Sequence, residues 1–115
     1  MGFTCKKTKL MDGESVICST AYTYYNNKIP IGRCVVTKKI RGNFKGWVNV
    51  NNVVIYEDHR GKGYCPKMLK CVLNKYKNNK IYIEVHKNNI PAIKCYHRCG
   101  FKVNKIVKNE IIMIL

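Results

Sequence analysis

Runs of apolar residues divide the chain into strands first and alternating helices and strands later. β-Branched and aromatic residues dominate residues 15–25 and 29–39, and a polar turn at residues 26–28 separates the two runs. This arrangement predicts an antiparallel hairpin. A third strand-like run covers residues 47–56. Its second half, from Val53 to Tyr56, is continuously apolar, which predicts burial on both faces.

Two helices are predicted in the second half of the chain. Apolar residues recur at helical spacing from Cys65 to Tyr76, and Pro66 suits a first helical turn, where a missing N–H costs nothing. A second helix is expected over residues 90–99, with Gly100 as its left-handed cap.

Three more strands are expected at residues 81–86, 101–107 and 111–115. The strand at 81–86 follows a helical crossover, so it should lie parallel to the strand at 47–56. The resulting order, β-β-β-α-β-α-β-β, predicts an α/β (α+β) fold with a mixed sheet. Residues 1–14 carry no clear pattern. Neither a linker nor a repeat divides the sequence, so we expect a single domain over residues 1–115.

A basic turn that contains two glycines connects the third strand to the first predicted helix. Its sequence is Arg60-Gly61-Lys62-Gly63-Tyr64-Cys65. Glycine lets the backbone approach an anion closely, and a helix N-terminus adds a partial positive charge of roughly half a unit. The turn therefore suits a phosphate group, although similar turns are also common as solvated loops.

A second motif spans residues 89–101 and places one tyrosine, Tyr96, on the inner side of a short helix. A phenol is a weak acid with a pKa of ~10, so it can act as a general acid. The plain alternative is that Tyr96 packs in the core together with Ala92 and Cys99. Asn89 suits the N-cap of this helix.

Glu84 interrupts the apolar run at residues 81–85. A carboxylate in such a strand is costly unless it is paired, neutral or functional. It could also simply face solvent or pair with a lysine. His86 and His97 are weaker candidates for proton transfer, because single histidines are usually structural.

Together, the two motifs resemble the coenzyme A motifs of the GNAT superfamily of N-acetyltransferases. The first matches the pattern Arg/Gln-x-x-Gly-x-Gly/Ala except at Cys65, and the spacing is closest to the ribosomal-protein N-terminal acetyltransferase type. The resemblance implies central strands that splay at the cofactor site and acetyl-CoA as the cosubstrate. It also implies direct acetyl transfer to a primary amine of a small molecule or protein. Only residues 1–14 stand where the family usually has a helical segment that shapes the acceptor pocket.

The resemblance also assigns roles to residues. Tyr96 would protonate the departing thiolate, and Glu84 would be the general base for the attacking amine. The backbone of the strand at 47–56 would meet the acetyl carbonyl and the pantetheine arm. The implied cofactor-binding residues are Val53, Ile55, Arg60, Gly61, Lys62, Gly63, Tyr64, Cys65, Asn89 and Tyr96.

The net charge widens the choice of partners. There are 22 Lys+Arg against 6 Asp+Glu, which gives +16 and implies attraction to polyanions such as coenzyme A or nucleic acid. Abundant Lys, Asn, Ile and Tyr are also typical of an AT-rich genome, and no nucleic-acid-binding motif is visible, so nucleic acid is not favoured. The alternative to an enzyme is a basic domain that binds coenzyme A, another polyanion or nucleic acid without catalysis.

The seven cysteines form no repeated CxxC pairs, which suits neither a disulfide framework nor a common zinc site. We therefore expect reduced, mostly buried thiols and no metal, with Cys95 and Cys99 packing against the core. The apolar runs are shorter than the roughly 20 residues that cross a bilayer. The N-terminus lacks the apolar core of a signal peptide. These features predict a cytoplasmic protein without a membrane partner, as a monomer or homodimer.

Overall fold

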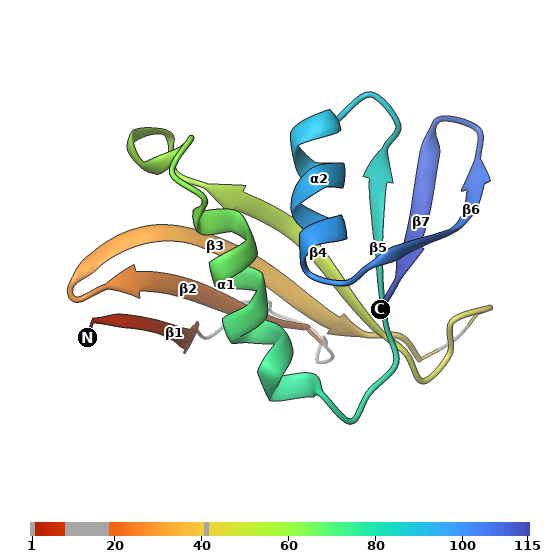
Figure 1. Cartoon of the computed structure of the whole chain (residues 1–115). Coiled ribbons are helices and arrows are strands. Elements are labelled where there is room, and N and C mark those ends of the chain that lie inside the picture. The colour runs from red at the N-terminus through yellow and green to blue at the C-terminus, as the bar shows by residue number, and fades with distance from the viewer. Residues whose placement is uncertain (1, 9–18, 41) are drawn as a thin grey trace.

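The computed structural model describes residues 2–8, 19–40 and 42–115, which form one mixed sheet with two helices on one face (Figure 1). The sheet has seven strands in the order β1-β2-β3-β4-β5-β7-β6. Neighbouring strands are antiparallel except for β4 and β5, which are parallel. Along the chain the elements are β1 (Phe3–Thr8), β2 (Ser19–Asn26), β3 (Ile29–Lys38), β4 (Val48–Ile55), the 3-10 turn η1 (Glu57–His59), α1 (Tyr64–Leu73), the 3-10 turn η2 (Asn74–Tyr76), β5 (Ile81–His86), α2 (Ile90–Arg98), β6 (Lys102–Val107) and β7 (Glu110–Ile114).

The predicted mixed sheet and the parallel crossover are confirmed, and one strand is added. The addition is β1, which pairs with β2 in a segment where the sequence showed no clear pattern. Two polar turn residues, Asn27 and Lys108, have positive φ values of 59° and 56° and allow the tight hairpins. Gly100, at φ 101°, follows α2 as predicted. The first residues of the predicted strand at 15–25 lie outside the described residues.

The core lies between the two helices and the sheet face that they cover. From α1, Met68, Leu69 and Val72 are completely buried, and they share one cluster with residues of the central strands. Ile81, Ile83 and Val85 of β5 belong to this cluster, whereas Glu84 between them is exposed. Alternation along a strand places such neighbours on opposite faces. Glu84 therefore lies on the face of the sheet opposite the helices.

The central strands β4 and β5 pair only at their beginnings. Their last paired residues are Val50 and Ile83, whereas β4 stays paired with β3 up to Ile55 and β5 with β7 up to His86. The two strands diverge beyond this point (Figure 1). The splayed central strands that the resemblance implied are thus confirmed. The expected burial of residues 53–56 on both faces is wrong, because β5 turns away and leaves Val54 39% exposed.

Gly32 fixes the approach of β3 to the end of β4. A Cβ atom at this position would lie 2.5 Å from the Val54 carbonyl oxygen and 2.9 Å from Ile55 Cδ1. We expect Gly32→Ala to lower the free energy of unfolding by about 2–3 kcal/mol, as other buried clashes do. Urea denaturation measures this loss. Gly46→Ala, at an open position with φ 87°, should cost only ~1 kcal/mol. Equal losses in the two variants would contradict a clash at Gly32.

Candidate active site

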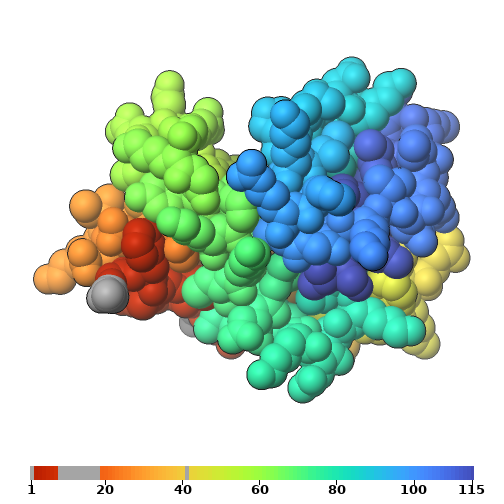
Figure 2. Space-filling model, viewed as in Figure 1, coloured from red at the N-terminus to blue at the C-terminus, as the bar shows by residue number. Residues whose placement is uncertain are grey.

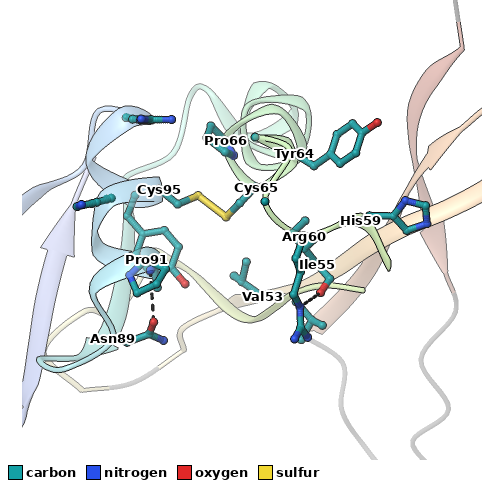
Figure 3. A pocket seen from close by; sticks show the side chains of 17 residues that line it. Val53, Ile55, His59, Arg60, Tyr64, Cys65, Pro66, Asn89, Pro91 and Cys95 are labelled. Carbon is teal, nitrogen blue, oxygen red and sulfur yellow. Dashed lines mark hydrogen bonds between the residues drawn. A yellow bond between two sulfur atoms is a disulfide. The ribbon is translucent and has the colours of Figure 1, made fainter. Parts of the chain in front are cut away.

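A cavity of about 790 Å³ lies where β4 and β5 diverge. It is bounded by the end of β4, the turn before α1, the first turn of α1 and one side of α2. Figure 2 shows the surface hollowed between the segment around residue 60 and α2. Figure 3 shows the side chains around it. The lining residues are Val53, Val54, Ile55, His59, Arg60, Gly61, Gly63, Tyr64, Cys65, Pro66, Asn89, Pro91, Ala92, Lys94, Cys95, Tyr96 and Arg98.

The turn before α1 has the backbone shape of an anion-binding site. Gly61 and Gly63 have φ values of 77° and 78°, which ordinary L-residues rarely adopt, and a Cβ atom on either would project into open space. Gly63 is the N-cap of α1, and no side chain caps the N–H groups of the first turn. These N–H groups and the helix dipole can therefore bind a phosphate.

Arg60 is held at the end of β4. Its Nε donates a hydrogen bond of 2.7 Å to the Ile55 carbonyl oxygen, which fixes the guanidinium beside the turn (Figure 3). Lys62 is exposed and does not line the cavity. The structure thus brings together every predicted cofactor residue except Lys62. Two further basic residues, Lys94 and Arg98, line the cavity from α2. Their separation of four residues places them on one helix face. This spacing was the sequence signal that could have identified them as a pair of cavity-lining residues.

Tyr96 lies on the opposite side of the cavity from the turn. It is 6% exposed, and its ring packs edge-on against Phe101 at a centroid distance of 6.2 Å. Burial, with smaller effects from Cys34 and Cys99, raises the pKa of Tyr96 to about 12. The hydroxyl therefore keeps its proton at neutral pH. The Asn89 side chain accepts a hydrogen bond of 3.3 Å from the Ala92 N–H, so it is the N-cap of α2 as well as a lining residue.

Glu84 faces a second cavity, of about 450 Å³, on the other side of the sheet. The Phe44 and Tyr82 rings stack in it at a centroid distance of 4.1 Å. Burial and the charge of Glu84 raise the pKa of Tyr82. The structure thus places Glu84 and Tyr96 in different cavities. The residues that line the second one are Lys39, Gly42, Asn43, Phe44, Tyr82, Glu84, Lys105, Val107, Lys108, Glu110 and Ile112.

Two lining cysteines are joined by a disulfide bond. Cys65, in the first turn of α1, is bonded to Cys95 of α2, with their Cα atoms 6.1 Å apart. The expectation of reduced thiols is therefore wrong for this pair, because the fold brings together two residues 30 positions apart in sequence. Cys5, Cys34, Cys71 and Cys99 are free thiols, and Cys18 lies outside the described residues.

The sequence matches the model of the Acetyltransferase (GNAT) family over residues 7–101. The chain belongs to this family. A solved Bacillus subtilis acetyltransferase in complex with CoA shares the GNAT fold, with a TM-score of 0.78 over 98% of this chain and 97% of that one, at 14% identity. The aminoglycoside acetyltransferase AAC(6')-Ib in complex with coenzyme A and kanamycin gives a TM-score of 0.72 over 85% of this chain and 66% of that one, at 21% identity.

Two curated GNAT relatives match part of the chain. The spermine/spermidine N(1)-acetyltransferase of Bacillus subtilis (strain 168) is 39% identical over 66 residues, which cover 54% of this chain and 43% of that protein. The N-alpha-acetyltransferase of Saccharolobus solfataricus is 34% identical over 64 residues, which cover 52% of this chain and 38% of that protein. The match spans less than half the length of either relative. The ribosomal-protein subtype stays a prediction.

The part of the chain that the structure describes offers neither a metal-binding cluster nor a membrane-spanning helix. There, no cluster of three or more His, Cys, Asp or Glu side chains is arranged to hold a metal ion. None of the helices described combines the length and apolar character that a membrane span requires.

The raised pKa of Tyr96 predicts a loss of stability in alkali. The unfolded chain releases this proton near pH 10, whereas the folded chain keeps it to about pH 12. The stability due to neutral Tyr96 is therefore complete below pH 10 and declines as the pH rises to 12. Urea denaturation over this range should show a smaller decline for Tyr96→Phe than for the unsubstituted chain. The same decline in both would contradict the burial of this hydroxyl.

Proposed function

We propose that the chain is an acetyl-CoA-dependent N-acetyltransferase that transfers the acetyl group directly to a primary amine. One observation carries this proposal: a single cavity at the divergence of β4 and β5 joins the anion-binding turn to a buried, protonated tyrosine. A cofactor with phosphates at one end and a thioester at the other matches these two ends. The relatives named above support the same activity.

The residues around the cavity fit coenzyme A. The N–H groups of the first turn of α1 would hold its pyrophosphate, with Arg60, Lys94 and Arg98 supplying positive charge. Beyond Val50, the edge of β4 that faces β5 has no strand partner, so its backbone groups can pair with an extended amide-bearing arm. The thioester of the bound cosubstrate would supply the activated acetyl group.

Two side chains would handle the protons. As the amine nitrogen bonds to the acetyl carbon, the carbon–sulfur bond breaks and the Tyr96 hydroxyl gives its proton to the departing thiolate. The Glu84 carboxylate accepts the proton that the amine loses, either directly or through water. Because the two residues lie on opposite faces of the sheet, the acceptor would enter from the second cavity. The reaction would take place where the diverging strands leave the sheet open.

We further propose that the acceptor amine belongs to a molecule with negative charge nearby. Glu84 and Glu110 can attract the amine itself, and the stacked Phe44 and Tyr82 offer an aromatic surface for a cation. Three lysines, Lys39, Lys105 and Lys108, also line this cavity, and the whole chain carries a net charge of +16. This charge would repel a free polyamine. A peptide N-terminus followed by acidic residues suits both sets of charges.

Titration calorimetry with acetyl-CoA at physiological salt tests the cofactor, with ATP as a polyanion control. We expect one-site binding with a Kd of the order of micromolar, or about −8 kcal/mol, that ATP does not reproduce. In turnover assays that detect acetylated product by mass spectrometry, a peptide with an acidic N-terminal sequence should be a better acceptor than spermidine. Equal, salt-sensitive binding of ATP and acetyl-CoA would instead indicate a basic domain without catalysis.

Single substitutions test the two proton-transfer roles. We expect Tyr96→Phe and Glu84→Gln each to lower kcat by about 10²-fold, as the loss of general acid or base catalysis does, while the Kd for acetyl-CoA changes little. Glu110→Gln is the matched control for Glu84, because it removes a carboxylate from the same cavity. It should raise the KM of the acceptor more than it lowers kcat. Full single-turnover rates in Tyr96→Phe would exclude Tyr96 as the acid.

A further inference from the structure

The disulfide crosses the cavity that the proposed function assigns to the cofactor. Cys65 belongs to the wall that carries the anion-binding turn, and Cys95 directly precedes Tyr96 on the opposite wall. In Figure 3 the two sulfur atoms span the space between α1 and α2. A ligand that reaches from the turn to Tyr96 would therefore lie close to this bridge.

We propose that Cys65 and Cys95 form a redox-active pair, whose disulfide narrows the cavity and weakens the binding of coenzyme A, and whose reduction widens it. The partner chemistry is thiol–disulfide exchange with a low-molecular-weight thiol such as glutathione. The effect on coenzyme A rests on the proposed function, whereas the exchange itself does not.

The disulfide joins the first turn of α1 to α2, and both helices also contribute residues to the core cluster. The two walls follow β4 and β5 in the chain, and the ends of these strands are not paired with each other. Beside the disulfide, Cys99 Sγ makes only a weak contact of 3.8 Å with the Pro66 carbonyl oxygen. The bond keeps the Cα atoms of Cys65 and Cys95 at 6.1 Å. After reduction, the two thiols can rotate apart and widen the space between the first turn of α1 and α2.

The surroundings of Cys65 favour exchange. It lies in the first turn of α1, beside the Arg60 turn, where the helix N-terminus stabilises a thiolate, and it lines an open cavity. Three of the four free thiols among the described residues form a thiolate less readily. Burial raises the pKa of Cys34 to about 12 and also raises that of Cys99. Burial and the nearby Cys71 raise the pKa of Cys5 to about 12.

The exchange balances in two steps. The Cys65 thiolate attacks one sulfur of glutathione disulfide, forms a mixed disulfide and releases one glutathione thiolate. The Cys95 thiolate then attacks the Cys65 sulfur, forms the bridge and releases the second glutathione. The protein loses two thiol protons and two electrons, and glutathione disulfide is reduced to two thiols. Two glutathione thiols reverse the sequence.

The first measurement locates the disulfide bond. Peptide mapping by mass spectrometry should find the Cys65–Cys95 link after incubation with glutathione disulfide, and free thiols at both positions after reduction. If these two cysteines stay unlinked in oxidant, the proposal is wrong.

Titration calorimetry with acetyl-CoA then compares the oxidised and reduced chain. We expect the reduced chain to bind at least about tenfold more tightly. In Cys95→Ala, which cannot form the bridge, the affinity should be the same in oxidant and reductant. Cys99→Ala is the matched control, because it removes a neighbouring thiol on α2 that does not line the cavity. It should keep the redox dependence of the unsubstituted chain.

The outcomes separate this proposal from the proposed function. Equal or tighter binding by the oxidised chain would overturn the redox control of coenzyme A binding and leave the acetyl-CoA site standing. Suppose that the Cys65–Cys95 bridge is found but acetyl-CoA binds in neither redox state and not to Cys95→Ala. This result would overturn the cofactor site and with it the redox control of coenzyme A binding.

Discussion

The short pairing between β4 and β5 is the constraint on which the rest of the site depends. A parallel pair in the middle of a sheet is normally continuous, and its backbone groups satisfy one another. Here the ladder stops at Val50 and Ile83 while both strands continue, each held by its outer neighbour. The interruption leaves backbone groups available to a ligand and separates the two helices that follow the strands. The cavity, the anion-binding turn and Tyr96 all take their positions from it.

The fold could be predicted from the sequence to a large extent because its signals are local. Polar turns between β-branched runs identified the hairpins, and the helical spacing after Pro66 identified the crossover that makes β4 and β5 parallel. The phosphate turn followed from its glycines, whose positive φ values are the property that glycine permits. The need for glycine at position 32 could not be predicted in this way, because it comes from the close approach of a carbonyl oxygen of another strand.

The parts that could not be predicted depend on which segments meet in space. Apolarity at residues 53–56 indicated full burial, but a strand that borders a cavity is apolar without being covered. Cysteine spacing indicated free thiols, because nothing local places Cys65 beside Cys95. The assignment of Glu84 to the opposite side of the sheet from Tyr96 follows from strand alternation only once the helices are known to cover one face. Its role as a base stays a prediction.

The sheet face opposite the helices combines polar contacts with a smaller set of buried apolar side chains. Asn51 Nδ2 donates to Asn49 Oδ1 at 2.8 Å and to Thr37 Oγ1 at 3.3 Å, and the Thr37 and Ser19 hydroxyls are hydrogen-bonded at 2.8 Å. Ala21, Val35, Tyr82 and Ile112 are buried here outside the core cluster, and Phe44 stacks on Tyr82. The molecule therefore has its main core on one face of the sheet and the candidate acceptor cavity on the other. The exposed side chains around this cavity can be exchanged during evolution at little cost to folding, so chains with this architecture can acquire new acceptors while their interior stays unchanged.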